Sequence, residues 1–168
     1  MKYIETGIEG FKLRFAERGD AAIILKFIRD LATYENELDQ VKGTEEMLDY
    51  SLFDRNGAEV IIGEYNNNPV GFALFFQSFS TFLARPGINL VDLYIEPEMR
   101  GKGFGKKILS YLAKLTEDRD CGRLEWWCHD WNDSAIKLYK KWGAFPINNI
   151  RVYRLCENAL TELSKELK

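Results

Sequence analysis

The stretch RGKGFGKKIL, residues 100–109, contains three glycines within five positions and then begins a pattern typical of a helix. Glycine lets backbone N–H groups converge on an anion, and the first turn of a helix adds about half a positive charge. The glycines are Gly101, Gly103 and Gly105, and the lysines that would strengthen this positive field are Lys102, Lys106 and Lys107. The stretch therefore predicts a loop that binds phosphate, with a plain structural turn as the alternative.

The spacing of these glycines argues against two familiar nucleotide sites. It reads G-x-G-x-G, whereas the dinucleotide fingerprint is G-x-G-x-x-G after the first strand of a βαβ unit. The mononucleotide loop requires a hydroxyl residue after its lysine, but Lys106 is followed by Lys107. A nucleotide-binding enzyme is therefore disfavoured.

Hydrophobic patterns on either side of the loop predict an α/β domain with helices against a sheet. Residues 11–16 alternate apolar and polar side chains as a half-buried strand does, and further strands are predicted at 58–65, 69–79, 88–96, 123–129 and 149–156. Helical spacing predicts helices at 21–35, 44–53, after the glycine loop, and at 132–143, with Asp20 and Asn132 or Asp133 as caps. Because no linker or repeat interrupts the pattern, we expect one domain spanning residues 1–168.

Composition excludes several classes of protein. A net charge of −3 lacks the basic balance of a nucleic-acid-binding protein, and no apolar run approaches the roughly 20 residues of a membrane span. The N-terminus lacks the apolar segment of a signal peptide. Three cysteines, Cys121, Cys128 and Cys156, suit neither a disulfide framework nor a metal site. We expect a cytoplasmic protein with reduced thiols and no metal.

Three linked features resemble the GNAT superfamily of N-acetyltransferases. Arg100, Gly103 and Gly105 fill its Arg/Gln-x-x-Gly-x-Gly/Ala signature, directly after the strand-like segment LVDLYIEPEM. Asn132 and Tyr139, within HDWNDSAIKLYKKWGA, match a later Asn and Tyr of that superfamily. The resemblance covers about residues 11–156. Two segments resemble the sequences of the diamine and thialysine acetyltransferase branch: FIRDLATYENELDQV and DWNDSAIKLYKKWGA.

This resemblance implies a fold and a cofactor. The expected fold is a single GNAT-like domain with a mixed, mostly antiparallel sheet, a splayed central strand and helices on both faces. The expected cofactor is acetyl-CoA, whose pyrophosphate would lie on the glycine loop. The residues implied to hold it are Leu93, Tyr94, Ile95, Arg100, Gly101, Lys102, Gly103, Phe104, Gly105, Lys106, Asn132, Asp133, Ser134, Ala135 and Tyr139.

The resemblance also implies catalytic residues. Tyr139 is the candidate general acid, because a tyrosine with a pKa near 10 stays protonated at neutral pH; the alternative is an aromatic side chain in the core. Asn132 can cap its helix, contact the cofactor, or do both. Candidate bases are Glu35, Asp92 and Glu37, and candidate substrate residues are Tyr34, Glu35 and Trp131. Neighbouring strand residues face opposite ways, which argues against a Cys128–His129 nucleophile.

The acceptor is left open between a small diamine or polyamine, a lysine-like amino acid, and a protein or peptide amine. Val91 stands where the branch commonly has an acidic residue, which weakens the case for a polyamine. The alternative outside the enzymes is a non-catalytic module that binds coenzyme A. The presence of Tyr139, the candidate acid, argues against it. A homodimer is expected from the habit of the superfamily alone.

Overall fold

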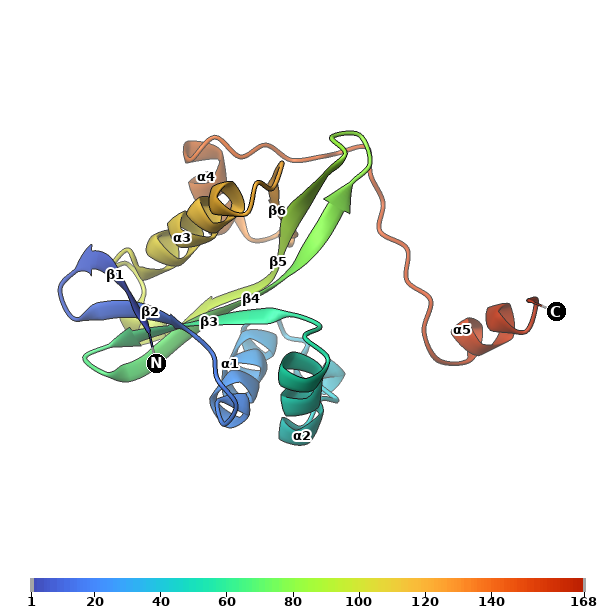
Figure 1. The fold of residues 1–168 in the computed structure, drawn as a ribbon, viewed down its shortest axis with the longest axis horizontal. Helices are drawn as coiled ribbons and strands as arrows, with labels where there is room; N and C mark the ends of the chain where they lie inside the picture. Colours follow the sequence, from blue (N-terminus) through green and yellow to red (C-terminus); the bar gives the residue numbers. More distant parts are fainter. Residues whose placement is uncertain (1, 168) are drawn as a thin grey trace. The chain divides into compact units, whose positions relative to one another are not determined.

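The computed structural model describes residues 2–167 as two compact units, which meet in the sequence between Trp127 and Cys128 (Figure 1). The described part of the first unit forms a six-stranded sheet in the order β1-β2-β3-β4-β5-β6. Its strands are β1 Tyr3–Ile8, β2 Phe11–Phe15, β3 Glu59–Tyr65, β4 Asn68–Ser80, β5 Arg85–Ile95 and β6 Leu124–Trp126. Neighbouring strands are antiparallel except for the parallel pair β5–β6.

Helices cover both faces of this sheet (Figure 1). α1 and α2 lie on one face and α3 lies on the other. Their bounds are α1 Ala21–Tyr34, α2 Glu45–Asp49 and α3 Phe104–Asp118, with short turns η1 Leu38–Gln40, η2 Tyr50–Asp54 and η3 Pro97–Met99. The expected mixed, mostly antiparallel sheet with helices on both faces is thereby confirmed.

Each face of the sheet has its own packing. On the α1 face, Phe27 contacts the rings of Phe72 and Tyr94, with centroids 5.7 and 6.0 Å apart. On the α3 face, Phe104 stacks on Phe11 at 3.9 Å. Burying aromatic side chains of this size contributes several kcal/mol in total, of the order of 2 kcal/mol each. The second half of β5 and the first turn of α3 are therefore fixed to the core.

A two-residue turn joins β3 to β4, as the asparagine-rich stretch predicted. Asn66 and Asn67 both have positive φ, at 50° and 64°, which is the conformation of a type I′ hairpin turn. Asparagine tolerates this region better than most residues. The turn aligns β3 with β4, and β4 in turn pairs with β5.

A bulge at Val91 changes which side of the sheet β5 presents. Leu90 pairs with Phe75, but Asp92 pairs with Leu74, so Val91 is an extra residue in the ladder. Leu74 packs against the core cluster under α1, and paired residues share a face. Asp92 therefore lies on the α1 face, whereas an unbroken strand would put it on the same face as Leu90.

Two local predictions were wrong. Asp20 precedes α1, but its side chain makes no cap hydrogen bond to the helix. Its carboxylate instead binds the guanidinium of buried Arg14, with N–O distances of 2.7 and 2.9 Å, because pairing that buried charge is the stronger demand. Residues 149–156 form no strand. Within the described part of the chain these residues have no ladder partner, and an extended segment needs one to form a sheet.

The second unit contains two helices in its described part, α4 Asp133–Lys141 and α5 Glu157–Ser164. Asn132 caps α4, as predicted, and Gly143 follows the helix with φ of +89°. Whether the two units form the single domain that the sequence predicts is not decided by these contacts, so the single domain stays a prediction. No helix in residues 2–167 has the length and apolar character needed to cross a membrane.

Candidate active site

The glycine loop between η3 and α3 presents a row of backbone N–H groups. Gly101 and Gly103 have φ of +77° and +84°, a region that strongly favours glycine. Before the helix, the last backbone N–H that donates to a backbone carbonyl is that of Arg100. Within the helix, the first is that of Lys107. In the described chain, the N–H groups of residues 101–106 have no such acceptor. Together with the positive helix end, they form a cradle suited to an anion.

The cradle is held in place by its own helix. The Phe104 side chain is buried and stacked on Phe11, so this residue faces a ligand through its backbone alone. A Cβ added to Gly103 would lie 3.6 Å from Ile8 Cδ1, while one on Gly101 would meet nothing within 4 Å. The loop is therefore open on one side and supported on the other.

Arg100 links this loop to two other elements. Its Nε donates a 2.9 Å hydrogen bond to the carbonyl of Ile95 at the end of β5. Its guanidinium lies over the rings of Tyr34 and Tyr94, at 4.8 and 5.6 Å from their centroids. Such cation–π contacts contribute about 0.5–1 kcal/mol each at exposed sites. The end of α1, the end of β5 and the glycine loop are thus tied together.

One edge of β5 is open beside the loop. β6 pairs only with residues 88–90 of β5 and ends at Trp126. Glu96 N–H donates to Val70 on the β4 side at 2.9 Å, so alternation turns the N–H groups of Leu93 and Ile95 to the other side. No described strand pairs with them there. The structure thus has the splayed strand that the resemblance implied. The same alternation turns the N–H of Tyr94 toward β4, and the binding of the cofactor arm by Leu93, Tyr94 and Ile95 stays a prediction.

Two of the candidate bases interact. Asp92 is half-buried on the α1 face, and burial raises its pKa from the usual 3.8 to about 6, with the negative charge of Glu35 as the second cause. Glu35 directly follows α1 and donates its N–H to Leu31. A carboxylate with a pKa near 6 is ionised at neutral pH and still able to take a proton. This pair is the part of the site best suited to proton transfer.

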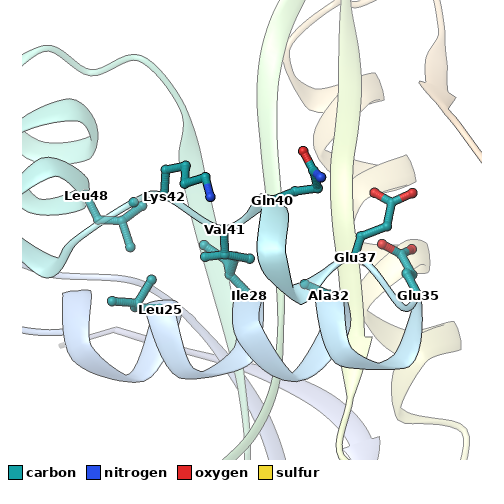
Figure 2. Close-up of a pocket in the computed structure, with 10 residues that line it drawn as sticks. Leu25, Ile28, Ala32, Glu35, Glu37, Gln40, Val41, Lys42 and Leu48 are labelled. Atoms are coloured by element: carbon teal, nitrogen blue, oxygen red, sulfur yellow. The ribbon is translucent and has the colours of Figure 1, made fainter.

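A pocket of about 340 Å³ begins at Glu35 and follows α1 (Figure 2). Its lining residues are Leu25, Ile28, Ala32, Glu35, Glu37, Gln40, Val41, Lys42, Gly43 and Leu48. Figure 2 shows the carboxylates of Glu35 and Glu37 side by side at one end of it. The third candidate base thus lies at the mouth of a largely apolar groove.

The second unit carries the remaining predicted residues. Burial raises the pKa of Tyr139 to about 12, with Cys128 as a further cause, so its hydroxyl stays protonated across the neutral range. Asn132 Oδ1 accepts hydrogen bonds from the Ala135 N–H and the Ser134 hydroxyl, at 3.3 and 3.1 Å. The ring of Trp131 stacks on His129 at 5.4 Å. Asn132 is thus a helix cap, and a contact with the cofactor stays a prediction.

Residues 25–144 match the family model described as the acetyltransferase (GNAT) family. This match covers well over half of the chain, including the glycine loop, β5 and Tyr139. The chain belongs to the GNAT acetyltransferase family. GNAT acetyltransferases use acetyl-CoA. That the glycine loop holds the pyrophosphate of this cofactor stays a prediction.

Relatives agree with this assignment. A thialysine N-epsilon-acetyltransferase of Bos taurus is 38% identical over 141 residues, covering 79% of this chain and 82% of the relative. An L-ornithine acetyltransferase of Arabidopsis thaliana is 39% identical over 95 residues, covering 56% of this chain and 42% of that protein. An integron cassette protein from the mobile metagenome of V. cholerae has the same fold, with a TM-score of 0.78, 24% identity and coverage of 94% and 99%.

The GNAT fold brings together some predicted residues and adds others. Glu35 interacts with Asp92, and Tyr34 lies against Arg100, although both pairs are far apart in sequence. Val41 ends the segment FIRDLATYENELDQV and Lys42 follows it, but neither was singled out as a candidate. Ile28 is one of the apolar positions at helical spacing in α1, and only the fold shows that it lines a pocket.

Proposed function

We propose that this GNAT acetyltransferase moves the acetyl group of acetyl-CoA directly to a primary amine on a small diamine, polyamine or lysine-like acceptor. The observation that carries the proposal is the interaction of Asp92, on the α1 face of β5, with Glu35, directly before Leu93 at the open edge of the strand. An ammonium group would be attracted to these carboxylates, and the free backbone donors lie on the adjacent part of the strand.

The residues proposed to hold acetyl-CoA fit its chemistry. The row of N–H groups at 101–106 suits a pyrophosphate, and the exposed lysines in the loop add positive charge. The N–H groups of Leu93 and Ile95 suit the amide-rich arm and the thioester oxygen, where a backbone donor stabilises developing negative charge. Bound acetyl-CoA supplies the thioester, whose carbon–sulfur bond breaks as the carbon–nitrogen bond of the amide forms.

Proton transfer is assigned to the predicted base and the predicted acid. An alkylammonium has a pKa near 10.4 and must lose a proton before its nitrogen can attack. Asp92, which interacts with Glu35, accepts that proton directly or through water, and Glu35 and Glu37 are the alternative bases. Tyr139 gives a proton to the departing thiolate, and its raised pKa ensures that it holds one to give. The nitrogen loses a second proton to solvent as the amide forms. The Tyr139 hydroxyl then takes a proton back from solvent, and Asp92 releases to solvent the proton that it accepted.

The acceptor class is supported by the relatives and by the local charge. The names of the relatives describe acetylation of thialysine and ornithine, both of which carry a side-chain amine. At the bulge, Val91 is 45% exposed and contributes no charge. The acidic surface near Asp92 is therefore smaller than a glutamate at position 91 would make it, which favours acceptors with one cation at the reacting end.

The experiment that tests this function measures thiol release from acetyl-CoA with spermidine, putrescine, lysine, thialysine and peptides with free N-termini. Turnover with one of the small amines is expected. Turnover with peptides alone would replace the proposal by a protein acceptor, and tight acetyl-CoA binding without any turnover would replace it by a coenzyme A-binding module.

A further inference from the structure

The groove along α1 has an aliphatic floor and roof. Leu25, Ile28 and Ala32 follow one another at helical spacing on one face of α1, and Val41 and Leu48 close over them from the following segment and α2 (Figure 2). These walls offer almost no hydrogen bonds to a ligand. At a rise of about 1.5 Å per residue, Leu25 and Ala32 are about 10 Å apart along the helix. The groove therefore suits a short, extended hydrocarbon chain.

The groove carries a negative charge at one end and a positive charge partway along it. Figure 2 shows the carboxylates of Glu35 and Glu37 at one end and the ammonium of Lys42 over the apolar part beyond Gln40. Lys42 Nζ donates one hydrogen bond, to the carbonyl of Asp39 at 2.7 Å, and an ammonium has three donors. The acidic end is the one that lies next to Asp92, since Glu35 interacts with that residue.

We propose that this groove binds the tail of the acceptor and that Lys42 selects a tail ending in a carboxylate. The preferred acceptor is then a linear ω-amino carboxylic acid, with its amine at the Glu35 and Glu37 end, methylenes along α1 and its carboxylate at Lys42. This inference rests on the proposed function and narrows its acceptor.

Charge decides between this acceptor and a diamine of the same length. A diamine would place its second ammonium beside Lys42, where the two like charges repel, and a neutral alkylamine would gain only apolar burial. Partly exposed ion pairs of this kind contribute up to about 1 kcal/mol, which corresponds to about a five-fold difference in kcat/KM. Lys42 is thus expected to change the relative kcat/KM of these acceptors several-fold.

Three acceptors of matched length separate these cases: δ-aminovalerate, cadaverine and pentylamine. The wild-type protein is expected to acetylate δ-aminovalerate with the highest kcat/KM, then pentylamine, then cadaverine. The Lys42→Glu variant should reverse the order of δ-aminovalerate and cadaverine, with the change mainly in KM. Lys114→Glu serves as the matched control, because Lys114 is an exposed lysine on α3, on the opposite face of the sheet, and should leave the order unchanged.

A preference for cadaverine in the wild-type protein, or an order that Lys42→Glu and Lys114→Glu leave equally unchanged, would overturn the assignment of Lys42. Either result would leave the proposed function standing, since amines would still be acetylated. Failure of the proposed function has a different signature, which is the absence of thiol release with all three acceptors and with the wider amine panel.

Discussion

Replacing Asp92 with asparagine should stabilise the protein at neutral pH while removing activity. The pKa of Asp92 rises from 3.8 to about 6 because burial and Glu35 both disfavour its negative charge. A shift of about 2 units, at about 1.4 kcal/mol each, makes the ionised carboxylate cost up to about 3 kcal/mol of folding stability. Asparagine has nearly the same shape and no charge, so Asp92→Asn should recover most of that cost at pH 7.

The sign of the pH dependence follows from the raised pKa. Protonated Asp92 favours the folded state fully below the unfolded pKa of 3.8, and this contribution is lost as the pH rises through about 6. The stability difference between Asp92→Asn and the wild type should therefore be near zero at pH 4 and reach its full value above pH 7. Urea unfolding at a series of pH values measures it. Glu35→Gln should give a smaller gain, because Glu35 is the second cause.

Kinetics with the best acceptor complete this test. As a base, Asp92 must be ionised, so kcat/KM should rise with pH through about 6, and Asp92→Asn should lower it by about 10²–10⁴-fold and remove that limb. An Asp92→Asn variant that is no more stable than wild type at pH 7, and that retains full turnover, would refute the reasoning on both counts.

Three further predictions concern residues around the cofactor and the acceptor. Tyr139→Phe should lower turnover by about 10²-fold or more with little change in acetyl-CoA affinity, as calorimetric titration and steady-state kinetics will show; unchanged turnover would remove Tyr139 from the acid role. Gly103→Val should weaken acetyl-CoA binding, because φ is +84° there and Ile8 is close, and equal affinity would contradict the loop assignment. Its control is Gly19→Val, which is strained at φ of +105° but lies outside the site. Arg100→Gln should raise KM for both substrates, since Arg100 joins the glycine loop to Tyr34, whereas an effect on acetyl-CoA alone would show that its contact with Tyr34 has no role.

Local sequence signals predicted most of the fold. The helices α1 and α3 have strong apolar faces, and paired asparagines at 66–67 have the turn preference of a hairpin. β1 was missed because Gly7, with φ of +74°, and a register shift between Glu5 and Ile8 disturb its alternation. Asp20 looked like a cap because the buried Arg14 that it binds is a tertiary partner, which no local pattern reveals.

The site was predictable to the extent that its chemistry lies in motifs. The glycine loop and the strand before it are contiguous in sequence, so their roles could be inferred together. The bulge at Val91 arises from the pairing of β5 with β4, which no local pattern reveals. Because of this bulge, Asp92 faces α1 and interacts with Glu35. The groove beside Lys42 depends on how η1 and α2 fold over α1, which the helical spacing within α1 cannot predict.

The most direct test of the account is to quantify both products of one reaction, the free thiol and the N-acetylated amine, after incubation with acetyl-CoA and a small amine acceptor. The account predicts one amide, identified by mass spectrometry, for each thiol released, with no acetyl group on the protein. Thiol release without amide formation, or an acetylated protein that accumulates before any amide appears, would contradict direct transfer to the amine.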